Sequence, residues 1–264
     1  MTEFKLIQFE KNREKKTARI TINRPEFRNA LNKAARREIR AAVEDIKKDK
    51  DVRVLIITGA GGKAFMSGMD ITELEKMSPV EIEEFVSTLG QQLYQDIEAL
   101  EIPVIAMVNG YCLAGGCELA MSCDIRIASE KAKFGQPEIN IGFIPGAGGT
   151  IRMPRLIGWG RAKELLYTGR MIDAEEALRI GLVDQVVPHD QLEETVDLIA
   201  AAIVSKSGLI IKYMKQAVNR GMYTDLAAGL VYEKLMWALC FATEDHHEGI
   251  NAFLNKRTPQ FKGK

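Results

Sequence analysis

Hydrophobic positions in the first half of the chain recur mostly as short runs typical of β-strands. Two of them, "FKLIQFEK" (4–11) and "TARITINR" (17–24), are separated by a charged turn and predict a pair of strands. Continuous β-branched runs follow at "RVLIITG" (53–59) and "PVIAMVNG" (103–110), which suit strands buried on both faces. "DIRIAS" (124–129) alternates between polar and apolar residues and predicts a further strand.

Helical periodicity occupies the segments between these strands. It predicts a helix from about Ala34 to Lys48, with apolar residues on one face. A longer helix should begin at Ser78-Pro79, because serine is a good N-cap and proline fits the first helical position. Its apolar residues keep helical spacing up to the break at Pro103.

In the second half of the chain almost every signal is helical. "RAKELLYTG" (161–169) ends in a glycine stop, and "DAEEALRIG" (173–181) begins with an aspartate cap. Three further amphipathic stretches run from about Gln191 to Lys256. Strands with interleaved helices followed by helices alone predict an α/β core over residues 1–190 and a helical C-terminal region over 191–264.

Composition and charge narrow the class of protein. The 264 residues are 46% hydrophobic, enough for a sizeable core. Lysine plus arginine and aspartate plus glutamate number 36 each, and this zero net charge argues against a nucleic-acid binder. The chain starts without an apolar signal-peptide core, and no apolar stretch approaches the roughly 20 residues that span a bilayer. We therefore expect a cytoplasmic protein that makes no membrane contact.

Cysteine and histidine patterns give no indication of a metal site. Cys112, Cys117 and Cys123 share one apolar segment, with no C-x-x-C pair and no neighbouring histidine. We expect them, with Cys240, to be reduced thiols in the core. The three histidines lie in the helical half, where we expect surface side chains rather than a catalytic base: His189, His246 and His247.

Two glycine-rich stretches resemble nucleotide loops without meeting their spacing. "TGAGGKAF" (58–65) lacks the G-x-x-x-x-G-K-[ST] pattern of a phosphate loop, and "GFIPGAGGT" (142–150) lacks G-x-G-x-x-G. The G-x-S-x-G motif of serine hydrolases is also absent from the sequence. These patterns disfavour a nucleotide-dependent kinase, a Rossmann dehydrogenase and a serine hydrolase.

Three glycine-rich segments remain as candidates for chemistry: "KAFMSGMDI" (63–71), "NGYCLAGGCELAMSCD" (109–124) and "AKFGQPEINIGFIPGAGGT" (132–150). In α/β folds the loops that follow strands gather at the carboxyl edge of the sheet, where ligands bind. Gly115-Gly116 precedes a helix-forming stretch, so its free backbone N–H groups would favour an oxyanion.

These segments, taken in order, resemble the enoyl-CoA hydratase/isomerase (crotonase) superfamily. The resemblance extends through "NRPEFRNAL" (23–31), "YTGRMIDAEEALRIGLVDQVV" (167–187) and "GINAFLNKRTPQFKGK" (249–264). It implies a crotonase-like α/β spiral of ββα units, with a helical C-terminal region that packs against neighbouring subunits. It also implies a homotrimer or a dimer of trimers, and no cofactor beyond the CoA moiety of the substrate.

The resemblance also assigns the chemistry to particular residues. Glu118 and Glu138 stand where hydratases carry their two catalytic glutamates, whereas many related isomerases and dehalogenases lack one or both. The backbone N–H groups of Met69 and Gly115 would form the oxyanion hole. Met69 replaces the alanine common in the family, a change that leaves the backbone donor in place and alters the size of the pocket.

The same resemblance places the CoA moiety. Residues 69–72 (Met69, Asp70, Ile71 and Thr72), together with Gly115, would line the ligand. Phe253 and Lys256 would approach the adenine end, from a neighbouring subunit or from the same chain.

The expected function is therefore reversible hydration of a 2-enoyl-CoA to a 3-hydroxyacyl-CoA. Two related reactions stay open, double-bond isomerisation of an enoyl-CoA and hydration of a cyclic dienoyl-CoA. Binding of AU-rich RNA, known for some hydratase relatives, is a remote alternative that the zero net charge disfavours. The sequence leaves the acyl chain length and the physiological direction of the reaction open.

Overall fold

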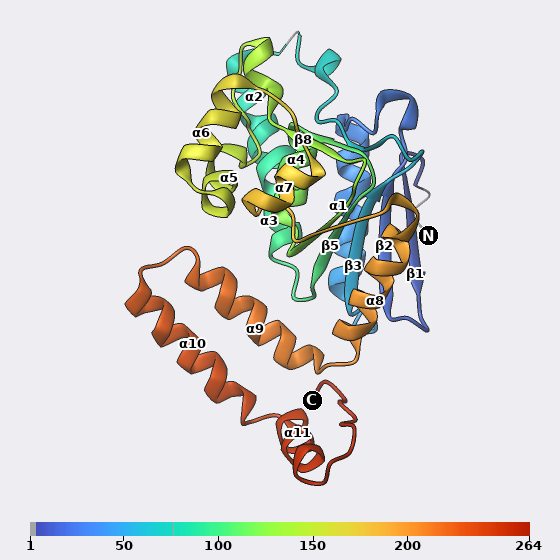
Figure 1. The fold of residues 1–264 in the computed structure, drawn as a ribbon, viewed down its shortest axis with the longest axis vertical. Helices are drawn as coiled ribbons and strands as arrows, with labels where there is room; N and C mark the ends of the chain where they lie inside the picture. Colours follow the sequence, from blue (N-terminus) through green and yellow to red (C-terminus); the bar gives the residue numbers. More distant parts are fainter. Residues whose placement is uncertain (1–3, 76) are drawn as a thin grey trace.

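Two β-sheets form the body of the molecule, and the chain passes alternately from one to the other (Figure 1). The computed structural model describes residues 4–75 and 77–264. The larger sheet has the order β1-β2-β3-β5-β7-β10, and all its neighbours are parallel except β1 and β2. Its strands are β1 Ile7–Asn12, β2 Thr17–Ile22, β3 Val54–Gly59, β5 Val104–Val108, β7 Ile125–Ser129 and β10 Gln185–Val187.

A second, smaller sheet has the order β4-β6-β8-β9. It contains the short strands that follow β3, β5 and β7, together with β9. Its strands are β4 Ala64–Met66, β6 Tyr111–Leu113, β8 Lys133–Gly135 and β9 Ile172–Asp173. Each repeat thus places one strand in each sheet before a helix, as in β3-β4, β5-β6 and β7-β8. This is the expected spiral of ββα units, and the chain therefore has the crotonase-like α/β fold.

The five long strands are confirmed, with one difference in the environment of β7. Arg126, a polar position of the alternating "DIRIAS" stretch, is buried rather than on an exposed face. Its guanidinium donates to the carbonyls of Cys123 and Leu182 and pairs with Asp184 at 2.9 Å. Because these acceptors satisfy the guanidinium, an alternating pattern here fits a strand buried on both faces.

The predicted helices of the first half are also present. α1 (Lys33–Lys48) is capped by the Asn32 side chain, and α2 (Pro79–Phe85) begins with the expected cap at Ser78, which forms a capping box with Glu81. The long helix continues from α2 through a π-helical segment, Val86–Gln91, into α3 (Gln92–Glu98). π-helical turns are rare and often mark functional sites. Here the segment lies beside the cavity described below.

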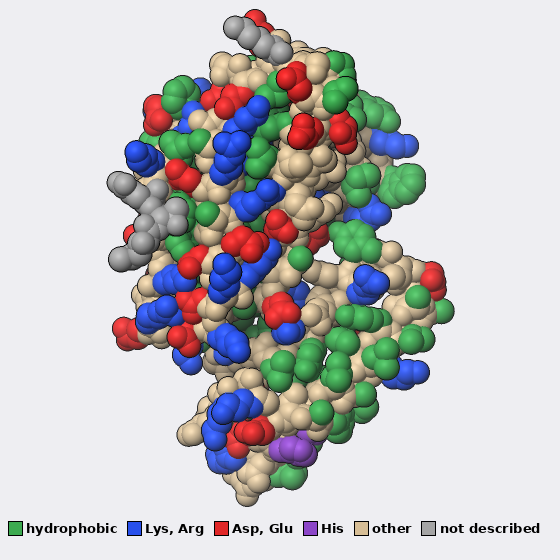
Figure 2. Space-filling model, turned by 180° about the vertical axis from the view of Figure 1, so that it is seen from behind, with side chains coloured by type: hydrophobic (Ala, Val, Ile, Leu, Met, Phe, Trp, Pro, Cys, Tyr) green, Lys and Arg blue, Asp and Glu red, His purple; other side chains and the backbone are tan. Residues whose placement is uncertain are grey.

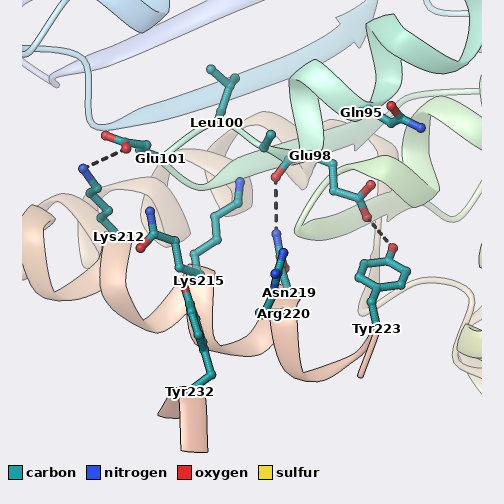
Figure 3. A pocket seen from close by; sticks show the side chains of 12 residues that line it. Gln95, Glu98, Leu100, Glu101, Lys212, Lys215, Asn219, Arg220, Tyr223 and Tyr232 are labelled. Carbon is teal, nitrogen blue, oxygen red and sulfur yellow. Dashed lines mark hydrogen bonds and ion pairs between the residues drawn. The ribbon is translucent and has the colours of Figure 1, made fainter. Parts of the chain in front are cut away.

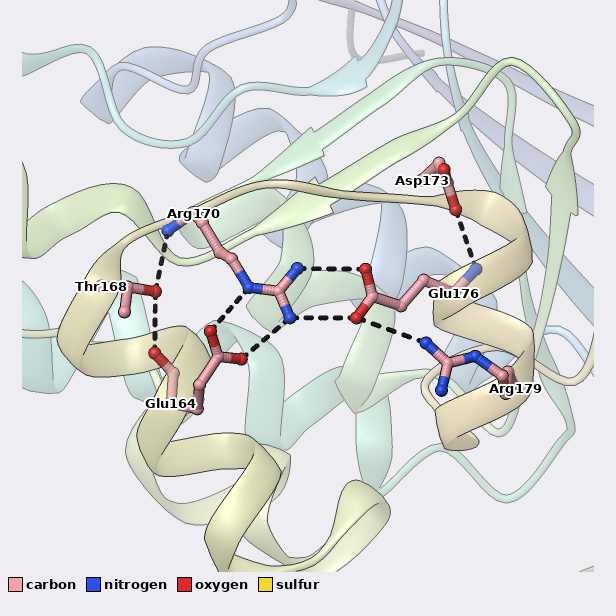
Figure 4. Close-up of polar contacts among 6 residues, drawn as sticks. All are labelled: Glu164, Thr168, Arg170, Asp173, Glu176 and Arg179. Carbon is pink, nitrogen blue, oxygen red and sulfur yellow. Dashed lines mark hydrogen bonds and ion pairs between the residues drawn. The ribbon is translucent and has the colours of Figure 1, made fainter.

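Four short helices complete the α/β body: α4 Gly115–Ser122, α5 Gly149–Ile157, α6 Trp159–Thr168 and α7 Ala174–Ile180. The expected glycine stop at Gly169 and aspartate cap at Asp173 are both observed. Arg170, between α6 and α7, forms paired contacts with Glu164 on one side and Glu176 on the other (Figure 4). This arginine fastens the two helices to each other.

The C-terminal region contains four helices rather than the three expected: α8 Leu192–Val204, α9 Gly208–Gly221, α10 Leu226–Cys240 and α11 Glu244–Leu254. α8 packs on the large sheet, where Val196 shares a core cluster with Val54 and Ile105. α9 and α10 form a hairpin in which α10 lies on the side away from the body (Figure 1). α11 lies at the open end of this hairpin, where the Ser207 hydroxyl at the start of α9 donates to Asp245. We refer to α9–α11, which follow α8, as the arm.

Polar contacts attach α9 to the body around a small cavity (Figure 3). Lys215 pairs with Asp124 at 2.7 Å, and Lys212 pairs with Glu101 at 2.7 Å. The Tyr223 hydroxyl donates to Glu98 at 2.9 Å. In the described part of the chain no single helix is long and apolar enough to cross a bilayer, although α10 and α11 together meet that test across a 75° bend.

Candidate active site

The three glycine-rich segments converge on one cavity of about 690 Å³. α1, Leu74, α2 and the π-helical segment supply the rest of its wall. Most of the lining is apolar, and the charged side chains among its described residues are Glu118, Glu138 and Arg36. None of the three histidines lines it. Cys112, Cys117 and Cys123 are free and buried, as expected, while Cys240 is partly exposed.

Glu118 reaches the cavity from the first turn of α4, a helix in which every residue is buried. Its Oε1 accepts hydrogen bonds of 2.7 Å from the backbone N–H groups of Ala147 and Gly149. Burial raises the pKa of this carboxyl, while the two N–H donors and the positive charge of Arg36 act in the opposite direction. The apolar run around Glu118 is therefore a buried helix that presents one carboxylate to a shared site.

Glu138 lies in the first turn of the short 3-10 helix Pro137–Ile141 and is 7% exposed. Burial raises its pKa to about 7, and the neighbouring charge of Glu118 acts in the same direction. The buried Gln136 amide, oriented by its hydrogen-bond partners, donates to both Glu138 oxygens at 3.0 and 3.1 Å. Glu138 therefore exchanges its proton near neutral pH and is held in one orientation.

Met69 and Gly115 both line this cavity, and neither backbone N–H has an acceptor in the loop and cap contacts of the described residues. Leu31 accepts from Asp70 and donates to Gly68, so this parallel bridge leaves the Met69 N–H pointing away from Leu31. Gly115 is the first residue of α4, where backbone N–H groups have no intrahelical acceptor.

Glycines allow the start of α4 to pack closely against the segment that precedes Met69. A Cβ atom on Gly115 would lie 3.6 Å from the Gly68 Cα. A Cβ on the adjacent Gly116 would lie 2.0 Å from the Met66 carbonyl oxygen, so only glycine allows α4 to start this close to β4. The arrangement suits a pair of donors that converge on one oxygen atom.

Only some of the residues expected to line CoA lie at the cavity. Ile71 lines it, whereas the Asp70 carboxylate is held by Arg24 at 3.0 Å and by the Thr72 hydroxyl at 2.7 Å. Phe253 belongs to α11 and Lys256 follows that helix, and neither residue lines this cavity; the Phe253 side chain is 83% exposed. One chain alone therefore does not bring these two residues to the site.

Three contributors to the site were not foreseen from the sequence. The donors to Glu118 are backbone N–H groups of residues 147 and 149, and backbone groups leave no residue-type signal. Gln136 stands two residues before Glu138 in "FGQPEI", and that proximity could have indicated it. Arg36 belongs to a helix that looks like an ordinary amphipathic helix, so its exposure to the cavity follows only from the fold.

Comparison with known proteins identifies the class. The family described as enoyl-CoA hydratase/isomerase matches residues 12–264, and the chain belongs to this family. It is 50% identical over 252 residues to a crotonyl-CoA hydratase of Syntrophomonas wolfei, covering 96% of both proteins. It is 48% identical to a short-chain-enoyl-CoA hydratase of Clostridium acetobutylicum, covering 93% of this chain and 94% of that one.

The fold also matches that of a solved structure. An enoyl-CoA hydratase from Bacillus anthracis superimposes with a TM-score of 0.93 at 41% identity, covering 98% of this chain and 100% of the other. These similarities over nearly the whole chain support the expected reaction. The protein is an enzyme that hydrates enoyl-CoA.

Proposed function

We propose that the protein hydrates short-chain 2-enoyl-CoA thioesters such as crotonyl-CoA, with Glu118 and Glu138 as catalytic residues. The observation that carries this assignment is a pair of buried carboxylates in one apolar cavity, beside the N–H groups of Met69 and Gly115. The two most similar relatives described above are named for crotonyl-CoA and short-chain substrates.

The N–H groups of Met69 and Gly115 bind the thioester oxygen. Addition of water to the conjugated double bond places negative charge on that oxygen in the transition state. Two fixed donors stabilise this charge, and losing one such donor typically lowers the rate by about 10²–10³-fold. Because the donors belong to the backbone, methionine at position 69 preserves them.

Glu118 and Glu138 divide the proton transfers. Glu118, held by two N–H donors, takes a proton from the water molecule as its oxygen bonds to C3. Glu138, whose pKa is raised to about 7, delivers its proton to C2. The water molecule is thus added as a hydroxyl at C3 and a hydrogen at C2, and solvent exchange restores both glutamates. A positioned acid or base contributes about 10²–10⁴-fold.

The same proposal assigns the CoA moiety to residues 69–72 and to Phe253 and Lys256 of a neighbouring subunit. Apolar side chains are exposed along the arm formed by α9–α11 (Figure 2). They include Leu226, which is 78% exposed, and Trp237, which is 65% exposed. Apolar patches of this kind mark interaction surfaces. They support burial of the arm against a neighbouring subunit, and the family resemblance implies a homotrimer or a dimer of trimers. A cytoplasmic location and the need for no cofactor other than CoA complete the proposal.

A pair of substrates distinguishes this mechanism from double-bond isomerisation. Glu118→Gln should abolish conversion of crotonyl-CoA to 3-hydroxybutyryl-CoA, while crotonyl-CoA binding persists. If the protein instead interconverts 3-enoyl-CoA and 2-enoyl-CoA and Glu118→Gln retains that activity, Glu138 acts alone and the two-glutamate mechanism is wrong. Product chromatography separates the three thioesters.

A further inference from the structure

Arg36 brings a positive charge into an otherwise apolar part of the catalytic cavity. It projects from the first turns of α1, is 3% exposed and lines the cavity. Among the described lining residues it is the only cation. The wall around it is formed by apolar side chains such as Ile82, Phe85 and Val86. A purely hydrocarbon acyl chain would need no charge at this position.

The other buried arginines of the molecule show how unusual this environment is. Arg24 pairs with Asp70 at 3.0 Å, and Arg126 pairs with Asp184 at 2.9 Å. The partly buried Arg152 likewise pairs with Glu98 at 2.7 Å. Arg36 forms no ion pair in direct contact with any described residue, and Glu118 of the same cavity interacts with its charge only at longer range. A buried charge without a partner is costly, which is why buried arginines are normally paired.

The guanidinium of Arg36 also has N–H groups without an acceptor among the described residues. Its Nη1 donates to the Leu89 carbonyl at 3.1 Å, and its Nε is buried without a partner among the described residues. The rings of Phe85 and Tyr94 lie 5.6 and 5.9 Å from its Cζ and hold it in place. A guanidinium has five N–H donors, so a fixed arginine with one such bond can bind a further acceptor.

The position of Arg36 places this acceptor near the reacting atoms. Tyr94, which contacts the guanidinium, donates from its hydroxyl to the Gly115 carbonyl at 2.9 Å. Gly115 in turn begins α4, which carries Glu118. Arg36 therefore lines the cavity close to the start of the helix that carries Glu118.

We propose that Arg36 binds an oxygen atom on the acyl group, so that preferred substrates are 2-enoyl-CoA thioesters with a hydroxyl, carbonyl or carboxylate oxygen beyond the double bond. This inference rests on the proposed function and names the substrate class of the same site. The acceptor satisfies the unpaired guanidinium, and an alkyl chain leaves it unsatisfied. Sites built to bind a polar group discriminate strongly against analogues that lack it.

The alternative is that Arg36 only supports the π-helical segment. Arg40, one turn later on α1, provides a matched control because its guanidinium donates to the Thr88 carbonyl of the same segment. Arg40 does not line the cavity. If support of the segment is the whole role, substitutions at both arginines should have the same effect.

Three thioesters with six-carbon acyl chains test the proposal: hex-2-enoyl-CoA, 6-hydroxyhex-2-enoyl-CoA and 5-carboxypent-2-enoyl-CoA. The readout is the ratio of kcat/KM for an oxygen-bearing substrate to kcat/KM for the alkyl substrate. Effects of Arg36 on Glu118 act on all three substrates and cancel in this ratio. We expect a ratio of at least about ten in the wild type, since a hydrogen bond to a charged group contributes roughly that factor or more.

Arg36→Met should lower the ratio by about 10–100-fold, whereas Arg40→Met should leave it within about twofold. The hydroxyl and carboxylate substrates distinguish a neutral acceptor from an anionic one. A wild-type ratio near one for both oxygen-bearing substrates would overturn the proposal. An unchanged ratio in Arg36→Met would overturn it as well.

Binding of the saturated analogues keeps the test independent of catalysis. Dissociation constants of hexanoyl-CoA, 6-hydroxyhexanoyl-CoA and 5-carboxypentanoyl-CoA should follow the same order in wild type, Arg36→Met and Arg40→Met. Tight, oxygen-dependent binding without hydration would contradict the proposed function and leave the role of Arg36 intact. If Arg36→Met fails to fold, the dissociation constants of the three ligands for the wild type still test the proposal.

Discussion

Glu118 and Glu138 are the same residue type in two different environments, and this difference assigns their roles. Burial raises the pKa of Glu118, but two backbone N–H hydrogen bonds and the charge of Arg36 act against that shift and favour its ionised form. Glu138 has a pKa raised to about 7, mainly by burial. Pairs of carboxyls with different environments commonly separate into a base and an acid.

The rate of hydration should consequently depend on the protonation of Glu138. Hydration requires the proton of Glu138, so kcat/KM for crotonyl-CoA should fall as the pH rises through about 7. The measurement is kcat/KM in buffers from pH 6 to pH 9 at constant ionic strength. A rate that stays level to pH 9 would show that Glu138 is not the acid.

The same raised pKa makes a prediction for stability. Because the pKa of Glu138 is higher in the folded state than its ordinary value of 4.5, the folded state holds more protons between pH 4.5 and about 7. Stability from this group is therefore present at low pH and is lost as the pH rises through that window, by about 3 kcal/mol.

Glu138→Gln removes the titration and provides the comparison. Its free energy of unfolding should decline less than that of the wild type between pH 4.5 and pH 8, with a difference of about 3 kcal/mol. Urea unfolding at several pH values measures this directly. Parallel pH dependences in the two proteins would mean that burial does not shift this carboxyl.

At the scale of elements, the start of α5 sets the position of Glu118. Gly149 is the first residue of this helix and donates to Glu118. A Cβ atom at this position would lie 2.7 Å from the Pro145 Cβ and 3.1 Å from the Glu118 Oε1. Even one methyl group would therefore displace the catalytic carboxylate or its donor.

Gly149→Ala should lower kcat by at least about tenfold, because a displaced base loses much of its contribution. Gly160→Ala is the matched control, since a Cβ on that α6 glycine would meet nothing within 4 Å. That control should keep full activity and gain up to about 1 kcal/mol of stability, because alanine is the better helix former. Steady-state kinetics measures kcat, and thermal unfolding measures the change in stability. Equal kcat values in both variants would contradict this account of α5.

The long elements of this fold are predictable from sequence, whereas the short elements and the site geometry depend on tertiary contacts. Strands β3 and β5 are runs of β-branched residues, and α1 and α2 carry their own caps. Strands β4, β6 and β8 have three residues each, too few for any periodic signal. They form because each follows a longer strand into a second sheet.

The candidate site shows the same division. Glu118 and Glu138 were identified through the motifs around them, and the structure brings both to one cavity. Their hydrogen-bond donors come from backbone groups and from Gln136, and the unpaired charge of Arg36 becomes evident only when its helix is packed. Except for Gln136, which is a near neighbour of Glu138, these contacts join residues far apart in sequence, and no local pattern encodes them.

For the whole molecule, the arm formed by α9–α11 is the feature that one chain leaves incomplete. α10 contains no buried residue, although its sequence is strongly apolar. Leu226, Leu230 and Trp237 share one face of this helix and are each more than half exposed. A helix that is apolar on all sides normally lies inside a protein or an interface.

We therefore expect sedimentation to show a trimer or a multiple of three subunits. Leu230→Glu combined with Trp237→Glu should shift this assembly toward the monomer, because charges in an apolar interface are costly. Leu198→Glu, on the exposed side of α8, is the control that should leave the assembly intact. A wild-type monomer at micromolar concentration would contradict the proposed role of the arm.

The central claim is that Glu118 and Glu138 together add water to a 2-enoyl-CoA. Its most direct test follows the ultraviolet absorbance of the conjugated thioester when crotonyl-CoA is mixed with wild type, Glu118→Gln or Glu138→Gln. The account predicts rapid loss of this absorbance with the wild type and a rate at least about 10²-fold lower with either variant. Undiminished hydration by either variant would contradict it.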